Sequence, residues 1–297
     1  MKPAGLAPSF ARMSLPDDPL VSCAWLAERL EAPDIRVVDA TWFMPADPRD
    51  AKAIFAERRI PGAIFFDVDE IADTSVDLPH MLPSPEKFAS RMKARGIGDG
   101  TRVIVYDNIG LQSAPRVWWT FRVMGHEDVA VLDGGFPAWE REGLPIETGP
   151  PQTRMERHFT PRMRADLVKN LEDVRRIIDG GGKNPILDAR SSARFRGEAP
   201  EPRAGLRGGH MPGALSLPFG ELIDANGFLK SVDELKQIFA ASGADTSKPA
   251  VCSCGSGLTA AIIALALARI GRWDASVYDG SWTEWGGRSD TPVVTGA

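Results

Sequence analysis

The chain has 297 residues, of which 43% are hydrophobic and 25% are charged, a composition typical of soluble globular proteins large enough for two hydrophobic cores. Its net charge of −5 argues against a nucleic-acid-binding surface, which is usually basic. The longest apolar run, residues 258–268, is too short to cross a bilayer, so we expect no membrane segment and no membrane partner.

The three cysteines, Cys23, Cys252 and Cys254, are too few and too unevenly placed for a disulfide framework. They suit a reducing compartment, and residues 1–19 lack the sustained apolar core of a signal peptide, so we expect a cytoplasmic protein. No cysteine or histidine spacing matches a zinc site, and no glycine-rich nucleotide-binding fingerprint occurs. We therefore expect neither a metal nor a cofactor.

A repeat divides the chain into two halves. Four short motifs of the first half return in the same order roughly 150 residues later: IRVVDAT (35–41) and NPILDARS (184–191), RIPGAIFF (59–66) and HMPGALSL (210–217), RVIVYDNIG (102–110) and PAVCSCGSG (249–257), and VLDGGFPAW (131–139) and VYDGSWTEW (277–285). Self-similarity at a fixed spacing indicates that one structural unit has been duplicated.

Each unit alternates short apolar runs with helical patterns. The runs at 37–40 and 186–189 contain an aspartate near their ends, as buried strands do where they reach a functional edge. Residues 258–269 are rich in Ala, Leu and Ile on all sides and predict a buried helix that ends near Gly271. This alternation predicts an α/β fold in which each half is a mainly parallel sheet with helices on both faces.

The predicted domain boundaries follow from the repeat. We expect a first domain at residues 14–145 and a second at 167–297. The intervening residues, 146–166, are rich in proline, glycine and charge and have no clear periodicity, so they are predicted to form a linker.

The densest chemistry lies at residues 254–259, Cys-Gly-Ser-Gly-Leu-Thr. A cysteine at the end of a predicted strand precedes a glycine-rich loop and a helix, so backbone N–H groups and the helix N-terminus point at its thiol. This arrangement stabilises a thiolate and makes Cys254 a candidate nucleophile, although a lone cysteine is usually only a buried apolar residue. Asp107 stands at the same position in the first half, so we expect that domain to be catalytically inactive.

With these motifs the chain resembles the rhodanese superfamily in its two-domain form, over residues 18–292. The loop resembles Cys-Gly-Ser-Gly-Val-Thr of the 3-mercaptopyruvate sulfurtransferases. Rhodaneses that prefer thiosulfate carry Arg and Lys after the cysteine, where this chain has Gly255 and Ser256. Related phosphatases have a longer loop that closes with an arginine, and this chain lacks it.

The resemblance implies a set of site residues. Arg194 and Arg203 match the family pattern that binds the carboxylate and ketone of the donor. Ser256, His80 and Asp69 match a Ser-His-Asp relay that handles the substrate's proton, the alternative for His80 being a capped loop histidine. The backbone around the sulfur is contributed by the remaining loop residues, Gly255, Gly257, Leu258 and Thr259. By contrast, Arg196 and Arg207 are predicted to be solvated surface charges, and His210 a structural residue.

The implied reaction is double displacement. Cys254 takes sulfur from 3-mercaptopyruvate as a persulfide, pyruvate is released, and a thiol or cyanide then accepts the sulfur. Thioredoxin is one candidate acceptor. Two alternatives remain open at this point: a thiosulfate sulfurtransferase (rhodanese), and a non-catalytic sulfur carrier or binding module that has kept the fold.

Overall fold

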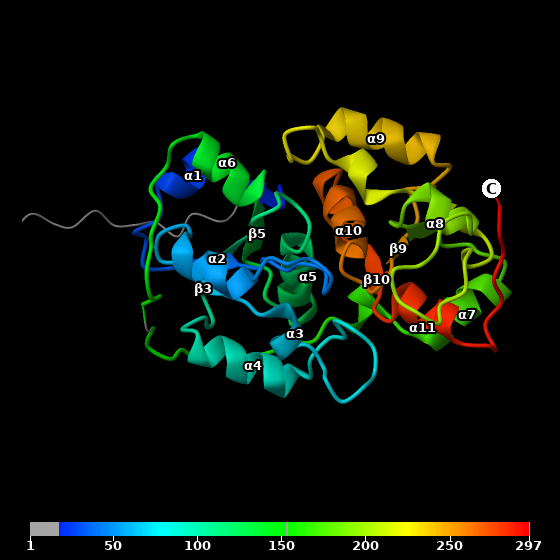
Figure 1. The fold of residues 1–297 in the computed structure, drawn as a ribbon, viewed down its shortest axis with the longest axis horizontal. Helices are drawn as coiled ribbons and strands as arrows, with labels where there is room; N and C mark the ends of the chain where they lie inside the picture. The colour runs from blue at the N-terminus through cyan, green and yellow to red at the C-terminus, as the bar shows by residue number, and fades with distance from the viewer. Residues whose placement is uncertain (1–17, 153, 297) are drawn as a thin grey trace, which may run out of the picture.

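The computed structural model describes residues 18–152 and 154–296. Residues 1–17, which make up most of the segment without a signal-peptide core, lie outside the described residues. The predicted domain ends at residues 14–17 and 297 lie outside them too. Two α/β units lie side by side, and the chain passes once from the first to the second (Figure 1). In the described part of the chain, no helix is long and apolar enough to cross a membrane.

Within residues 18–152, five parallel strands form one sheet in the order β1-β5-β4-β2-β3. Their bounds are β1 (Leu20–Val21), β2 (Ile35–Asp39), β3 (Ile64–Phe65), β4 (Arg102–Tyr106) and β5 (Val129–Leu132). Neighbouring residues in the central strands enter different cores, since Val37 and Ile104 pack on one face of the sheet and Val38 and Val105 on the other. Burial on both faces explains why the middle of each of these strands is a continuous apolar run, Val37–Val38 in β2 and Val103–Val105 in β4.

The helices of the first unit cover both of those faces. The core of Val37 contains side chains of α1 (Cys23–Ala27), α2 (Ala51–Glu57) and α6 (Gly135–Arg141). The core of Val38 contains side chains of α3 (Val68–Ile71), α4 (Pro85–Ala94) and α5 (Ala114–Val123). The start of α4 follows from local sequence, because the Ser84 side chain accepts from Lys87 N–H and Pro85 takes the first helical position.

The second unit repeats this plan. Its parallel strands are ordered β6-β10-β9-β7-β8, which is the order of the first sheet position for position in residues 154–296. The strands are β6 (Val168–Lys169), β7 (Ile186–Asp188), β8 (Ala214–Ser216), β9 (Val251–Ser253) and β10 (Ser276–Tyr278). One face packs on α7 (Leu171–Asp179), α8 (Ser192–Arg196) and α11 (Ser281–Gly287), and the other on α9 (Val232–Ala241) and α10 (Ala260–Arg269). The predicted fold class is therefore confirmed.

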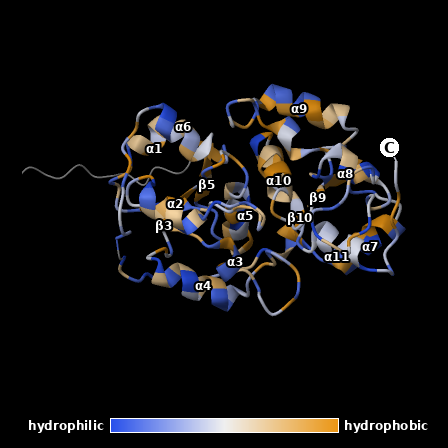
Figure 2. Ribbon diagram, viewed as in Figure 1, coloured by the Kyte–Doolittle hydropathy of each residue, from blue (hydrophilic) through white to orange (hydrophobic). Residues whose placement is uncertain are grey.

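The two units share a core through α5 and α10, which pack against each other. Helix α10 is apolar on all sides (Figure 2), because one side covers its own sheet and the other meets the first unit. The helix begins at Ala260 rather than at Leu258 as predicted, since Leu258 and Thr259 belong to the loop that precedes it. It ends at Arg269, and Gly271 follows with φ +89°, as expected of a residue that closes a helix.

The segment predicted as a linker lies against the first unit. The carbonyl of His158 accepts from Asp99 N–H at 2.8 Å, and Phe159 is buried in the core. A Cβ atom at Gly98 would lie 2.4 Å from that carbonyl oxygen, so only glycine permits the close approach. The short helix η1 (Ala165–Leu167) then leads into β6.

Candidate active site

Cys254 follows β9 directly and is only 1% exposed. Its own amide donates to Ser281 Oγ at 3.2 Å, and its carbonyl accepts from Trp282 N–H at 2.9 Å, so its backbone is fixed on both sides. The amide groups of residues 255–259 find no hydrogen-bond acceptor among the described residues. The loop between β9 and α10 is thus a set of open N–H donors next to a thiol.

The first unit shows what such a loop holds. At the position of Cys254 stands Asp107, whose buried carboxylate accepts five backbone N–H groups at 2.8–2.9 Å. The donors are Ile109, Gly110, Gln112, Ser113 and Ala114. A loop of this shape therefore binds a negative charge, which Asp107 supplies covalently in the first unit.

Arg194 and Arg203 both approach the Cys254 loop. A Cβ atom at Gly255 would lie 3.3 Å from Arg194 Nη2 and 3.9 Å from Arg203 Nη1. Glycine at this position thus leaves room for two guanidinium groups beside the thiol. Burial lowers the pKa of Arg203, and a thiolate at Cys254 opposes that effect because it favours the charged form.

Glu201 holds Arg194 in this position, and the sequence analysis did not identify it. One Glu201 oxygen accepts from Nε and Nη2 of Arg194, and the other accepts from Arg190 Nη1 at 2.7 Å. Arg190 in turn pairs with Asp188 at 2.6 Å and stacks on the ring of Trp282. Glu201 belongs to the Glu-Pro-Arg motif that identified Arg203. The motif does not show that the Glu201 carboxylate pairs with Arg194.

His80 crosses from the first unit to the Cys254 loop. Its Nδ1 lies 3.0 Å from Ser256 Oγ, and its Nε2 lies 3.4 Å from a carboxylate oxygen of Asp69. Trp42 supports the pair, since its indole N–H donates to Asp69 at 2.8 Å and its ring meets the imidazole edge-on at 4.7 Å. The structure therefore brings together the three side chains of the predicted relay, although 176 positions of sequence separate His80 from Ser256.

The surroundings of His80 keep its ring neutral. Burial, with the nearby charges of Arg116 and Arg203, lowers the pKa of His80 to about 3. A neutral imidazole can accept a proton at one nitrogen while donating at the other. His80 can therefore pass a proton to or from Ser256 at neutral pH, whereas a permanent imidazolium could not.

Arg116 connects this histidine with the loop. Its guanidinium donates to the carbonyl oxygens of His80 and Gly257 and forms an ion pair with Asp279 at 2.7 Å. His80 has a φ of +62°, which is uncommon for a residue with a side chain. Gly257 has a φ of +75°, and a Cβ there would lie 2.8 Å from Arg116 Nη1. The Arg116 side chain therefore holds two unusual backbone positions on opposite sides of the domain interface.

The remaining predicted residues have mixed environments. The side chain of Leu258 is buried in the core, so only its backbone faces the loop. Thr259 precedes α10 without a side-chain capping bond. His210 is structural as predicted, because its Nδ1 bonds the Phe195 carbonyl at 2.8 Å. Burial raises the pKa of the Cys252 thiol, which suits a core residue.

The prediction for Arg207 was wrong. Its guanidinium is not a solvated surface charge, because it donates to the carbonyls of Gly286, Trp285 and Thr291 and to the Thr291 hydroxyl. An arginine fork can satisfy several carbonyl groups at the end of a helix, here α11, a role that no local sequence pattern announces. Arg196 does match its prediction, since it pairs with Glu198 at the surface.

A cavity of about 490 Å³ opens beside the site between the two units. Its walls include Asp69 and His80 from the first unit, and Arg203, Leu206 and Thr283 from the second. Three or more His, Cys, Asp or Glu side chains suited to a metal ion gather nowhere in residues 18–152 and 154–296. The site offers a thiol, two guanidinium groups, open N–H donors and a proton relay. Arg203 and His80 also line the cavity, which is large enough for a small organic acid.

Comparison with known proteins identifies the family. A family model described as "Rhodanese-like domain" matches residues 22–142 and 170–288. The chain is 42% identical over 272 residues to 3-mercaptopyruvate sulfurtransferase of Homo sapiens, which covers 90% of this chain and 91% of that protein. It is 41% identical over 296 residues to thiosulfate/3-mercaptopyruvate sulfurtransferase 1, mitochondrial, of Arabidopsis thaliana, with coverage of 93% and 78%.

A solved structure gives the same result. The crystal structure of SseA from Escherichia coli, described as a 3-mercaptopyruvate sulfotransferase with the rhodanese fold, matches with a TM-score of 0.82 and 40% identity. The match covers 89% of this chain and 99% of that one. The chain belongs to the rhodanese family and consists of two rhodanese-like domains in tandem.

Proposed function

We propose that this protein is a sulfurtransferase that moves sulfur from 3-mercaptopyruvate, through a persulfide on Cys254, to a thiol or cyanide acceptor. The observation that carries the proposal is the composition of the site. Cys254 begins a loop whose backbone N–H groups are free to bind an anion, and Arg194 and Arg203 lie beside this loop. From the first domain, His80 contacts Ser256 of the same loop. The relatives named for this reaction, at 42% identity over 90% of the chain, support the choice of donor.

The first half-reaction balances without a cofactor. The Cys254 thiolate attacks the sulfur of 3-mercaptopyruvate, a sulfur–sulfur bond forms, and the carbon–sulfur bond breaks. The electron pair of the broken carbon–sulfur bond moves onto the carbon and gives the enolate of pyruvate. Arg194 and Arg203 bind the oxygens of this enolate. The donor's thiol proton passes through Ser256 and His80 to the enolate carbon and completes the methyl group of pyruvate. A persulfide anion remains on Cys254.

The loop amides suit this intermediate. In the first domain, the carboxylate of Asp107 receives five N–H bonds from the corresponding loop. The outer sulfur of a Cys254 persulfide would extend from the same backbone position and carry a similar charge. We assign the amides of residues 255–259, among them those of Gly255, Gly257, Leu258 and Thr259, to its stabilisation. Asp107 itself carries no transferable sulfur, so we propose that the first domain is inactive.

In the second half-reaction, the sulfur on Cys254 passes to an acceptor. An acceptor thiolate attacks the outer sulfur and regenerates Cys254, and a thiol protein such as thioredoxin is one candidate for that acceptor.

Three free cysteines suit the reducing cytoplasm, which we keep as the proposed location. We also keep the proposed boundaries of residues 14–145 and 167–297, with a linker at 146–166; the two matched rhodanese-like segments fall inside the domains.

Thiosulfate is the second candidate donor. A relative named for both donors is 41% identical to this chain, nearly the same figure as the relatives named for 3-mercaptopyruvate alone, so overall identity does not separate the two. Inside the loop, the positions after the cysteine are Gly255 and Ser256, which add no positive charge for a dianion. We therefore place 3-mercaptopyruvate first.

The test is steady-state sulfur transfer to a common thiol, with 3-mercaptopyruvate and thiosulfate compared at equal concentrations. We expect a large preference for 3-mercaptopyruvate that Cys254→Ser abolishes. Cys252→Ser is the matched control, because this second thiol lies two residues away in the core and should leave turnover unchanged. A preference for thiosulfate would replace the donor, and no turnover of either would favour the non-catalytic sulfur carrier.

A further inference from the structure

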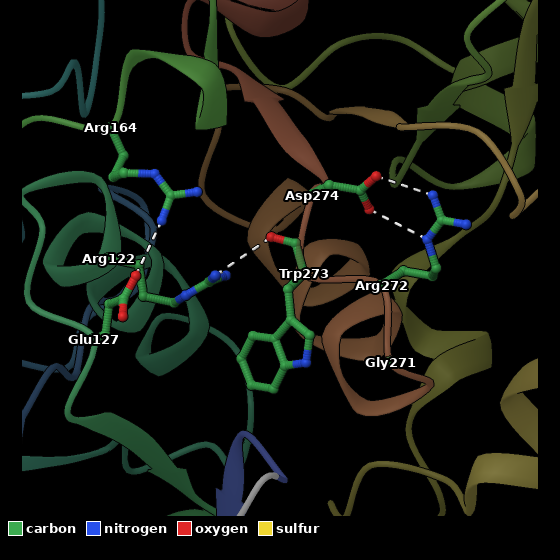
Figure 3. Close-up of a pocket in the computed structure, with 7 residues that line it drawn as sticks. All are labelled: Arg122, Glu127, Arg164, Gly271, Arg272, Trp273 and Asp274. Atoms are coloured by element: carbon green, nitrogen blue, oxygen red, sulfur yellow. Dashed lines mark hydrogen bonds and ion pairs between the residues drawn. The ribbon is translucent and has the colours of Figure 1, made fainter.

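A second cavity, of about 590 Å³, lies between the two domains and shares no lining residue with the cavity beside His80. Figure 3 shows its lining residues, which come from three parts of the chain. The first domain contributes Arg122, at the end of α5, and Glu127. The segment before η1 contributes Arg164, and residues 271–274, which follow α10, contribute the wall from the second domain.

Arg122 is the unusual residue in this cavity. The buried arginines in the described part of the chain have a carboxylate oxygen within 4 Å, with Arg122 as the exception: Arg59 pairs with Glu147, Arg102 with Asp34, Arg116 with Asp279 and Arg190 with Asp188. Arg122 is 8% exposed and lies between the rings of Trp118 and Trp273, at 5.0 and 4.8 Å. Its guanidinium donates a hydrogen bond to the Trp273 carbonyl at 3.3 Å.

Its neighbours do not supply the missing charge. Arg164 is close enough to repel it, and burial together with that repulsion lowers the pKa of Arg122 to about 10. The carboxylates of Glu127 and Asp166 act on Arg122 from a distance, but both are bonded to Arg164, at 3.1 and 2.9 Å. Arg272 is turned toward Asp274, as Figure 3 shows, and pairs with it at 2.9 Å. A buried charge that lacks a partner is costly, so an external anion would relieve this cost.

We propose that this cavity binds a small oxyanion, or the phosphate, sulfate or carboxylate group of a small molecule, between Arg122 and Arg164. Planar guanidinium groups bind such groups through paired N–H donors. The cavity is within the size range of small-molecule sites, and the exposed indole of Trp273 offers a flat face beside the anion. The bound group would contact both domains, on a side of their interface away from Cys254.

Trp273 provides the readout. Protein labelled with 5-fluorotryptophan is titrated with inorganic phosphate at constant ionic strength, and the ¹⁹F resonance of Trp273 is assigned with Trp273→Phe. We expect a saturable shift of that resonance. Arg122→Gln should weaken the apparent affinity roughly tenfold or more, because it removes the buried charge. Arg164→Gln, at a half-exposed side chain, should weaken it severalfold and tests the site even if the Arg122 variant folds poorly.

The matched control is Arg58→Gln, which removes an exposed arginine paired with Glu140 elsewhere on the first domain. It should leave the phosphate titration unchanged. Sulfur-transfer turnover, measured in parallel, confirms that each variant is folded, because none of these arginines lies at Cys254. A Trp273 shift that rises linearly without saturation, or that is the same in the Arg122 and Arg164 variants as in the unaltered protein, would overturn the proposal.

Discussion

The backbone N–H of Leu82, in the first domain, donates a 2.8 Å hydrogen bond to the carboxylate of Asp279, in the second. The same bond exists with the domains exchanged, from Leu229 N–H to Asp133 at 2.9 Å. The interface is therefore nearly two-fold symmetric, as expected when duplicated units pack face to face. The symmetry does not extend to the side chains of the site. On one side of the interface, His80 of the first domain contacts the Cys254 loop of the second. At the symmetric place, the Asp107 loop of the first domain meets the second domain where Gly110 approaches Gly227.

The first prediction concerns the Arg116–Asp279 pair. Asp279→Asn removes the charge that holds Arg116 and should cost about 3 kcal/mol of unfolding free energy, since a buried cation is left without its partner. It should also lower kcat about tenfold or more. Arg116 holds the His80 carbonyl in place, and general acid–base catalysis depends on the position of the His80 ring. Steady-state kinetics and urea denaturation measure the two effects.

Asp133→Asn is the control at the symmetric position. It weakens the bond from Leu229 N–H and the 3.8 Å approach of Arg269, so some stability should be lost. Its kcat should stay unchanged, because no catalytic side chain lies beside Asp133. Equal losses of kcat in the two variants would mean that general interface stability, and not the position of His80, explains the effect.

The second prediction concerns Glu201 as a positioning residue for Arg194. Glu201→Gln removes the charge that fixes the guanidinium next to Gly255, so the KM for 3-mercaptopyruvate should rise roughly tenfold, with a smaller change in kcat. Glu198→Gln, which removes an exposed carboxylate paired with Arg196, should change neither constant. An unaltered KM in the Glu201 variant would show that Arg194 is held by its packing alone.

The third prediction concerns the pH dependence of stability. The pKa of His80 is about 3 in the folded protein and about 6.5 in the unfolded chain. Between these values the unfolded chain binds a proton that the folded protein does not, so stability is lost as the pH falls. From pH 6.5 to 4.5 the unaltered protein should lose about 2–3 kcal/mol more than His80→Gln does.

Denaturation curves at several pH values check this expectation. His158→Gln, at an exposed histidine, is the control and should follow the unaltered protein throughout. If the His80 variant showed the same pH dependence as the unaltered protein, His80 would have to be protonated in the folded state. The neutral relay with Ser256 would then be wrong.

The fourth prediction concerns the loop of the first domain. Asp107→Ala removes the acceptor of five backbone N–H groups, three of them in buried hydrogen bonds, and should cost about 3 kcal/mol or more of unfolding free energy. Asp107→Asn keeps one carbonyl oxygen and should cost less. The KM for 3-mercaptopyruvate should not change in either folded variant. A loss below about 1 kcal/mol in Asp107→Ala would contradict the account of this loop as an anion cradle.

Much of this architecture could be predicted, because it depends on local patterns. The repeat is a property of the letters, and strand–helix alternation follows from the spacing of apolar residues. The Cys254 loop could also be recognised, since a strand, a glycine-rich turn and a helix follow one another within a few residues. The start of α10 was placed two residues early, because Leu258 is apolar although it belongs to the loop.

Residues that act across the interface were harder to predict. His80 and Asp69 came from a family resemblance, because 176 residues separate His80 from Ser256 and no spacing relates them. Glu201 was missed because a glutamate in a charged loop has no pattern that distinguishes a buried partner of two arginines from a solvated one. Arg207 was misassigned for the same reason, as its acceptors are backbone carbonyls that the sequence does not mark.

The sequence by itself thus determined the two units, their parallel sheets and the cysteine loop, since each depends on residues that are close in the chain. The tertiary structure alone decided which charges are paired and which are left over. It set Arg116 on Asp279 and enclosed a neutral His80 against Ser256. It also left Arg122 between two indoles, where no carboxylate of residues 18–152 and 154–296 lies within 4 Å of it. The physical reason is that the cost of a charge depends on its burial and its partners, and both are fixed only when distant segments pack together.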